Sequence, residues 1–151
     1  MITIIAIGKK HETWMQSGIE RYQKRLKQPW NIEWMLLPHS SLEGQRARQE
    51  ESQRILARIK PSDTVILLDE TGKLLDSPAL SKLCSAQFTH GTSLVFVIGG
   101  AYGVSSTLHQ RATTIWSLSP LVFPHQLVRL LLAEQLYRAQ EIARGGSYHH
   151  M

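Results

Sequence analysis

The sequence predicts an α/β protein with a mostly parallel sheet and helices on both of its faces. Apolar runs of strand length alternate along the whole chain with segments of helical periodicity, as in sheets built from crossover helices. The central run at 64–69 is apolar almost without interruption, as expected of a strand covered on both sides. At 151 residues, the chain is most simply one domain spanning 1–151.

The first third of the chain predicts a strand, a helix and a second strand. Residues 2–7 are rich in isoleucine and stop at Gly8, which indicates a buried strand. Residues 11–27 carry apolar side chains at helical spacing and a basic end, and Pro29 stops that helix. Residues 32–37 read as the second strand.

The middle third predicts a helix on each side of the central strand. Residues 40–60 are polar and helical, with Ser41 as a plausible cap. After the strand at 64–69, residues 71–73 are expected to turn the chain. The next helix begins with a serine and a proline at 77–78 and is expected to run to about residue 88.

The last third predicts two strands that lead into a long apolar helix. The strand at 92–98 is followed by a glycine loop and a short helix at 105–110. A β-branched strand follows at 113–118, and the last helix runs over 124–143. Glycines at 145–146 give it a typical stop.

Composition and charge exclude several classes of protein. Cys84 is the one cysteine, so neither an intrachain disulfide nor a thiolate zinc cage is possible. The N-terminus does not have the order of a signal peptide, and no apolar run approaches the roughly 20 residues that span a bilayer, so we expect a cytoplasmic protein without a membrane role. Residues 1–60 hold 11 Lys and Arg against 6 Asp and Glu, whereas residues 61–151 hold 6 of each. A basic half beside a neutral half indicates a polyanionic partner, although an ordinary basic surface is the alternative.

Two loops are candidates for the walls of one ligand pocket. Glycines 99, 100 and 103 follow a buried strand, where a backbone can approach a ligand closely. The segment 118–124 leads directly into the last helix. The glycine spacing is not that of the dinucleotide fingerprint, and no phosphate-binding loop with its lysine occurs. A simple tight turn is the alternative interpretation of the glycines.

The last helix is apolar around most of its circumference. Such a helix must be buried on all sides, which in a small domain favours a second subunit, so we expect a homodimer rather than a monomer. Arg129 lies within this apolar stretch, followed by Glu134 and Arg138 at i, i+4 spacing. An internal ion pair and a direct role of Arg129 in substrate binding are both open.

Other polar groups give weaker signals. Tyr148, His149 and His150 would ordinarily form a frayed tail, and no HExxH motif or carboxylate partner supports a metal site. His125 opens the last helix, where the helix N-terminus favours neutral imidazole. The adjacent Asp69 and Glu70 are expected to point in opposite directions, which argues against a two-carboxylate glycosidase.

One family combines these features. FVIGGAYG, SLSPLVFPHQLVRLLLAEQLYRAQEI and the terminal YHH occur in order, together with MITIIAIGKK and the central ILLDETGK. Over essentially its whole length the chain resembles the small SPOUT-class methyltransferases that methylate N3 of a pseudouridine in bacterial 23S ribosomal RNA, the ribosomal RNA large subunit methyltransferase H family.

The resemblance implies a homodimer whose C-terminal part is threaded as a deep trefoil knot, a topology that first principles would exclude. It implies S-adenosylmethionine as the cofactor, bent within the knot, and no metal. The implied cofactor-binding residues are Leu68, Gly99, Gly100, Gly103, Leu118, Ser119, Pro120, Leu121, Val122 and Phe123.

The resemblance also implies how substrate and active site meet. His149 is the first candidate for accepting the N3 proton or positioning the base, Tyr148 for stacking or hydrogen bonding, and Arg129 for orienting the nucleotide. The basic residues of the first helix, with Lys9, Lys10 and Trp30, would hold 23S ribosomal RNA through its phosphates. Rival interpretations are a SPOUT methyltransferase acting on transfer RNA, a non-catalytic ribosome-binding or assembly factor, and a generic nucleotide-binding domain.

Overall fold

The protein contains a parallel five-stranded sheet. The structure is a computed structural model that describes residues 1–150. The strands are β1 (Ile2–Ile7), β2 (Ile32–Leu37), β3 (Thr64–Leu74), β4 (Leu94–Ile98) and β5 (Thr114–Ser117). They lie in the order β2-β1-β4-β3-β5, and each pairing is parallel. The prediction of a mostly parallel sheet is confirmed.

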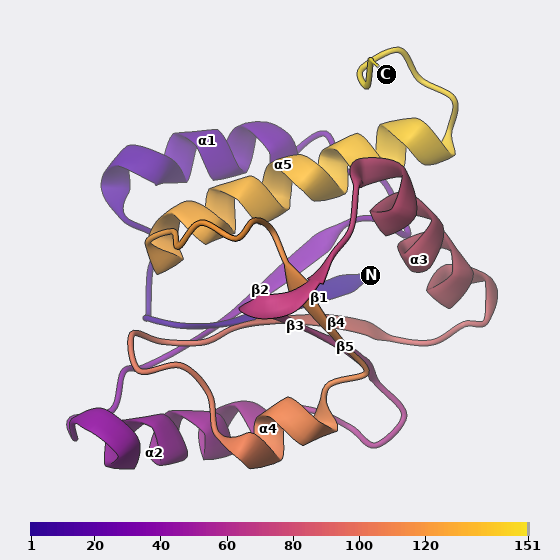
Figure 1. The fold of residues 1–151 in the computed structure, drawn as a ribbon. Helices are drawn as coiled ribbons and strands as arrows, with labels where there is room; N and C mark the ends of the chain where they lie inside the picture. Colours follow the sequence, from indigo (N-terminus) through magenta and orange to yellow (C-terminus); the bar gives the residue numbers. More distant parts are fainter. Residues whose placement is uncertain (151) are drawn as a thin grey trace.

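Helices cover both faces of this sheet, as the sequence predicted (Figure 1). They are α1 (Thr13–Gln23), α2 (Gly44–Leu56), α3 (Ser77–Thr89), α4 (Ser106–Arg111) and α5 (His125–Ala143). Helices α1, α3 and α5 lie on one face, and α2 and α4 lie on the other. Because successive strand residues point to opposite faces, the strands supply two apolar cores. One contains Phe96 with Leu136 of α5, and the other contains Val97 with Ile55 of α2.

The first two helices are shorter than the sequence predicted. The first was expected over 11–27 and spans Thr13–Gln23, and the second was expected over 40–60 and spans Gly44–Leu56. Ser41 does not cap the second helix, since Glu43 holds that position and makes no side-chain cap hydrogen bond. Polar composition alone could not separate the helix from the loop that precedes it.

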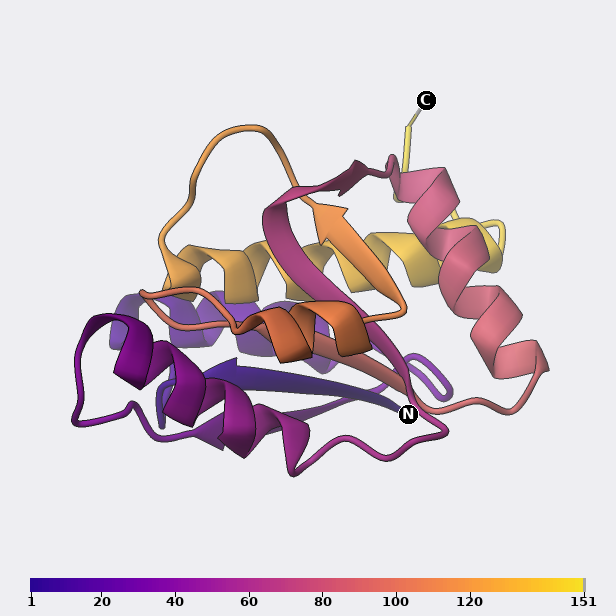
Figure 2. The ribbon, with the colours of Figure 1, turned by 60° about the horizontal axis from the view of Figure 1, so that its bottom comes forward.

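The predicted turn at 71–73 is wrong, because these residues lie within β3. The strand pairs with β5 through Leu68, loses register, and pairs again from Lys73 onward, so that it curves over its neighbour (Figure 2). A Cβ atom added to Gly72 would lie 2.5 Å from the carbonyl carbon and oxygen of Ile115. The missing side chain of Gly72 therefore lets two backbones approach each other closely.

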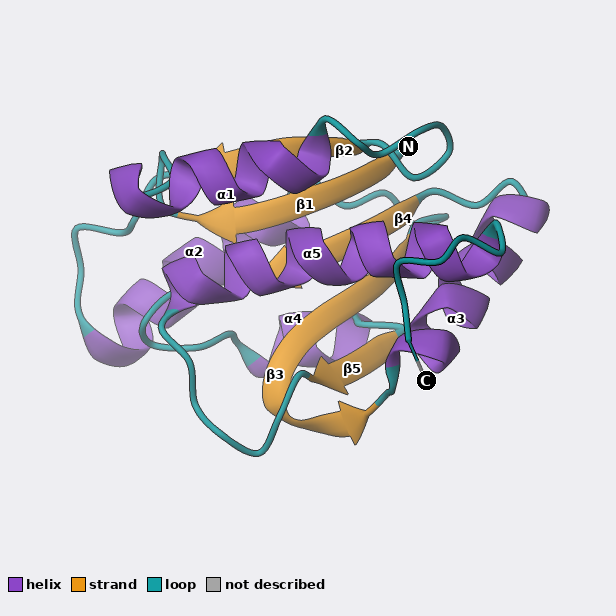
Figure 3. Cartoon of the chain, turned by 90° about the horizontal axis from the view of Figure 1, so that it is seen from above, coloured by secondary structure: helices purple, strands orange, loops and turns teal. Residues whose placement is uncertain are grey.

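Helix α5 lies beside α1 over the sheet (Figure 3). Leu132 and Leu136 are completely buried, whereas Leu127, Leu130 and Leu131 are half-buried. The outer side of α5 is therefore not fully covered within one chain.

Trp30, which the sequence assigned to the RNA-binding surface, belongs to the core instead. It is 6% exposed and packs edge-on against Phe88, with 4.9 Å between the ring centroids. A side chain enclosed in this way cannot contact RNA phosphates. The basic side chains near it in the sequence, such as Lys24 and Lys27, lie at least partly at the surface.

Candidate functional site

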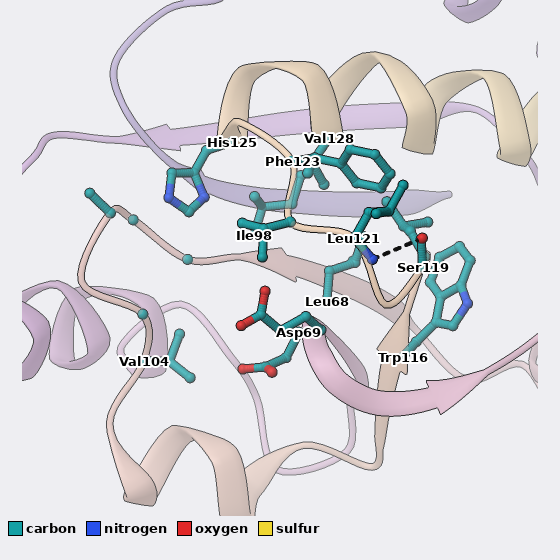
Figure 4. A pocket seen from close by; sticks show the side chains of 17 residues that line it. Leu68, Asp69, Ile98, Val104, Trp116, Ser119, Leu121, Phe123, His125 and Val128 are labelled. Carbon is teal, nitrogen blue, oxygen red and sulfur yellow. Dashed lines mark hydrogen bonds between the residues drawn. The ribbon is translucent and has the colours of Figure 1, made fainter.

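A pocket of about 350 Å³ lies at the ends of β4 and β5, where β3 between them loses its register (Figure 4). Leu68 of β3 pairs with Ile98 of β4 on one side and with Trp116 of β5 on the other, so the ends of β4 and β5 are level with this point of β3. The first turn of α5 closes the pocket with His125 and Val128. The carboxyl ends of parallel strands are the usual position of a ligand site in an α/β protein.

The residues that the resemblance implies for cofactor binding gather here. Pro120 is the exception, since it does not line the pocket. Their part in binding a cofactor stays a prediction, although the fold does bring residues from three distant segments into one cavity. The residues that line it are Leu68, Gly99, Gly100, Gly103, Leu118, Ser119, Leu121, Val122 and Phe123.

The glycine loop forms one wall and leaves no space for a side chain at its second glycine. A Cβ atom added to Gly100 would lie 2.6 Å from Oε1 of Glu51. Glu51 is 3% exposed, and its Oε2 accepts a hydrogen bond of 3.0 Å from the Ser40 amide. The loop then turns back, with the Gly103 amide donating to the Gly100 carbonyl at 3.0 Å. This wall consequently offers backbone groups to a ligand.

The opposite wall is the loop between β5 and α5. Ser119 shapes it from both sides: its carbonyl accepts from the Ser117 hydroxyl at 2.8 Å, and its hydroxyl accepts from the Leu121 amide at 3.0 Å. Leu121 and Val122 are 69% and 77% exposed. Two such apolar side chains at the mouth of a pocket are well placed to cover a flat, weakly polar ligand.

Several lining residues were not proposed from the sequence. Asp69 and Glu70 both line the pocket, although alternation along a strand suggested that they point apart. The irregularity of β3 begins immediately after Leu68, so the alternation ends there. Asp69 Oδ1 accepts hydrogen bonds from the amide and hydroxyl of Thr71, at 2.8 and 2.7 Å. No periodic pattern in the sequence could have indicated this bend.

His125 was noted in the sequence and also lines the pocket. Partial loss of contact with water, and secondly the neighbouring Arg129 guanidinium, lower the pKa of His125 below its ordinary value of 6.5, although the residue remains partly exposed at the pocket wall. The expectation of a neutral imidazole therefore agrees in direction, but the main cause is desolvation and not the helix N-terminus.

Arg129 is completely buried and is not among the residues that line the pocket. Its guanidinium donates to the carbonyls of Ile7, Gly8 and Lys10 at 3.0, 3.1 and 2.9 Å. Burial lowers the pKa of Arg129. These contacts tie α5 to the loop after β1, so they support a structural role. The predicted role in orienting a nucleotide has no contact in its favour.

Tyr148 and His149 lie beside the pocket rather than in it. His149 lines a second hollow, of about 620 Å³, which shares Trp116, Leu118 and Phe123 with the first. The Tyr148 hydroxyl donates to Glu134 Oε1 at 3.1 Å. Burial raises the pKa of Tyr148 to about 12, so this hydroxyl keeps its proton near neutral pH.

Residues 1–150 contain neither a metal-binding cluster nor a membrane-spanning helix. Within that range, no group of three or more His, Cys, Asp or Glu side chains could hold a metal ion. No helix in the same range has the length and apolar character that crossing a membrane requires.

The chain matches a methyltransferase family model over almost its whole length. A family model described as "Predicted SPOUT methyltransferase" matches residues 1–149. Among solved structures, the chain is similar to the SpoU methyltransferase AviRb from Streptomyces viridochromogenes in complex with the cofactor AdoMet, with 11% sequence identity and a TM-score of 0.48. That match covers 97% of this chain and 59% of that chain. The family match takes in both walls of the pocket and the tail as far as His149.

Proposed function

Because the chain belongs to the SPOUT methyltransferase family, we propose that it transfers a methyl group from S-adenosylmethionine to N3 of a pseudouridine in bacterial 23S ribosomal RNA. The observation that carries this proposal is the pocket between the glycine loop and the β5–α5 loop. The substrate assignment rests on the resemblance, since the same pocket would serve a relative acting on transfer RNA.

The pocket has the chemistry that S-adenosylmethionine requires. Adenine and ribose are neutral, so apolar side chains such as Leu118 and Phe123 can enclose them while backbone groups at Gly99 fix their orientation. The sulfonium is cationic, and the carboxylates of Asp69 and Glu70 bring negative charge to the same cavity. The residues present therefore fit this cofactor.

The bound cofactor would supply an already activated methyl group, so neither a metal nor a protein nucleophile is needed. The chain's own residues have to align the target base and exclude water. Leu121 and Val122 would cover the cofactor at the mouth of the pocket. We assign positioning of the base to Tyr148 and His149 of the tail. We leave Arg129 out of this step because it is completely buried and its Nη1 and Nη2 donate to backbone carbonyls.

The proposal includes a homodimer and the trefoil knot that the resemblance implies. The half-buried leucines of α5 and the exposed Trp14 of α1, which is 66% exposed, would form the subunit interface. The basic side chains at the end of α1, together with Lys9 and Lys10, would hold ribosomal RNA in the cytoplasm through phosphate contacts.

The first experiment is a calorimetric titration with S-adenosylmethionine, with ATP and NADH as controls. Leu121→Ala should weaken cofactor binding, because Leu121 lines the pocket and is 69% exposed, so its truncation leaves the core intact. Leu74→Ala is the matched control, because Leu74 is similarly exposed, at 62%, but lies outside the pocket. Equal effects of the two substitutions would contradict the assigned cofactor site.

The second experiment is methyl transfer to ribosomes that lack the modification, followed by mass spectrometry of the digested RNA. We expect one added methyl group on a pseudouridine of 23S RNA. Methylation of transfer RNA instead would favour the rival enzyme. Failure to bind S-adenosylmethionine would favour a ribosome-binding factor without catalytic activity.

A further inference from the structure

We propose that Glu134 and Arg138 of α5 are positioning residues that hold His149 in its Nε2–H tautomer, so that His149 donates a hydrogen bond to the target base instead of accepting its N3 proton. The inference rests on the proposed function and deepens it, because it chooses between the two roles that the sequence left open for His149.

Glu134 and Arg138, one helical turn apart on α5, form an ion pair. Arg138 Nε and Nη2 donate to Glu134 Oε1 at 2.9 and 2.6 Å. The side chains of Arg138 and Glu134 are 25% and 17% exposed, so water competes weakly for these bonds. The hydrogen bond with Glu134 raises the pKa of Arg138 above its ordinary value. Arg138 is therefore a permanent cation with Nη1 left to contact another group.

The C-terminal tail contacts this ion pair through two consecutive residues, Tyr148 and His149. The Arg138 guanidinium lies 4.7 Å from the centroid of the Tyr148 ring, and the Tyr148 hydroxyl donates to Glu134. The Tyr148 ring also packs edge-on against Tyr137, with 4.8 Å between centroids. Tyr148 thus anchors the tail, and the next residue, His149, is placed beside Arg138.

The contact between Arg138 and His149 determines which ring nitrogen carries the proton. Arg138 Nη1 lies 3.1 Å from His149 Nδ1. A guanidinium has donors and no acceptor, so Nδ1 must accept this bond. The neutral imidazole then carries its proton on Nε2. A ligand atom that contacts Nε2 of His149 therefore has to accept a hydrogen bond from it.

A donor at Nε2 suits the chemistry of the target base. His149 lines the second hollow, which shares Trp116, Leu118 and Phe123 with the cofactor pocket, so a base there would lie next to the methyl group. When the N3 proton leaves to water, the negative charge spreads from N3 onto the two flanking carbonyl oxygens. A hydrogen bond from Nε2–H to one of these oxygens stabilises that anion. With S-adenosylmethionine bound, the N3 lone pair would form the new bond to the methyl carbon while the carbon–sulfur bond breaks, which would leave a neutral thioether.

Several charged or titratable groups lie around His149. Arg138 and Glu134 face it from α5, Tyr148 and His150 flank it in the tail, and Asp76 lines the same hollow from the start of α3. The test therefore reads the tautomer directly as well as the pH dependence of turnover.

The tautomer is measured by long-range proton–nitrogen NMR on the full-length protein with ¹⁵N-labelled histidine. We expect His149 to show a protonated Nε2 and an unprotonated Nδ1 in the wild type, and a mixture of tautomers in Arg138→Gln. The ring of His90 next to α3, which contacts the Ala86 carbonyl, is the internal control and should not change. A protonated Nδ1 in the wild-type protein would overturn the proposal without any RNA being present, so this measurement does not depend on the proposed reaction.

The turnover of two variants distinguishes whether His149 acts as a hydrogen-bond donor or as a base. His149→Gln places an amide donor near the position of Nε2 and removes the basic ring nitrogen, and its place in the tail keeps the core intact. We expect it to retain turnover within about tenfold of the wild type, whereas His149→Ala loses about a hundredfold or more, in line with the loss of a preorganised donor. S-adenosylmethionine affinity should be unchanged in both variants. Equal loss in the two variants, with a pH profile that flattens in both, would assign His149 as the base and refute the proposal.

Discussion

Among the individual residues of the chain, two arginines of α5 donate hydrogen bonds in different surroundings. Arg129 is enclosed among backbone carbonyls and uses its donors to hold the loop after β1. Arg138 is paired with a carboxylate and directs its remaining donor to the tail. In each case Nη1 also contacts a histidine Nδ1, that of His11 for Arg129 at 3.2 Å and that of His149 for Arg138 at 3.1 Å.

The contact between His11 and Arg129 predicts a pH-dependent stability. Burial, and secondly Arg129, lower the pKa of His11 below its ordinary value of 6.5 in the folded protein. As the pH falls below about 6.5, the unfolded chain binds the proton first, so acidification favours unfolding. His11→Asn keeps an acceptor for Arg129 but does not titrate. We therefore expect its urea midpoint to fall less than that of the wild type between pH 7.5 and pH 5.

The comparison variant for this prediction is His90→Asn next to α3, because the His90 ring contacts the Ala86 carbonyl instead of Arg129. His125 contributes a change of the same sign and remains in every variant, so the dependence should be reduced in His11→Asn and not abolished. Identical pH dependence of His11→Asn and the wild type would show that His11 does not contribute.

Among the helices and strands, the irregularity in β3 has the largest effect on the shape of the pocket. The strand holds Leu68 level with Ile98 and Trp116, then bends so that Asp69 and Glu70 both reach the cavity, and then rejoins β5. The bend is possible because Gly72 lies against the backbone of β5. The absence of a side chain at Gly72 therefore permits the bend that brings Asp69 and Glu70 to the pocket.

We predict that Gly72→Ala destabilises the protein and deforms the pocket together. The added Cβ would lie 2.5 Å from the Ile115 carbonyl and 2.7 Å from the Trp116 nitrogen, and backbone atoms cannot move aside as a flexible side chain can. The expected loss in the free energy of unfolding is about 1–3 kcal/mol or more, measured by urea denaturation. Lys73→Ala, at the neighbouring position, should change it by less than about 0.5 kcal/mol. An unchanged stability of Gly72→Ala would mean that β3 and β5 are not held as closely as described.

Across the molecule as a whole, exposed apolar side chains are unevenly placed. Leu121 and Val122 lie at the pocket mouth, whereas Trp14 lies on α1, the helix that runs beside α5 with its half-buried leucines (Figure 3). A bound cofactor would cover the first group, and a second copy of the chain would cover the second.

Trp14→Glu should therefore convert the proposed dimer into a monomer. Trp14 is 66% exposed in the single chain, so the substitution should leave the fold intact while placing a charge in an apolar interface. Light scattering after size exclusion should give twice the chain mass of 17.1 kDa for the wild type and the chain mass for the variant. The control Leu74→Glu, at a similarly exposed apolar position on β3, should remain dimeric. A wild-type protein with the mass of one chain would refute the dimer.

Local patterns in the sequence were enough to predict the class of fold and the order of its elements. Hydrophobic periodicity is local information, so the strands 2–7 and 32–37 could be predicted from it with their correct ends, and the long last helix with an error of one residue at its start. The glycines 99, 100 and 103 and the loop after β5 could likewise be identified as candidate walls of a pocket, and the structure favours this interpretation of the glycines over a simple tight turn.

Contacts between distant parts of the chain determined the features that these local patterns could not predict. Residues 71–73 continue β3 because this strand pairs with β5, which lies about 40 residues further along the chain. A local sequence pattern contains no information about such a partner. Burial of Trp30 and enclosure of Arg129 also depend on neighbours distant in sequence. The tautomer of His149 depends on one such neighbour, Arg138, because a hydrogen-bond partner is fixed by position in space and a sequence pattern carries only distance along the chain.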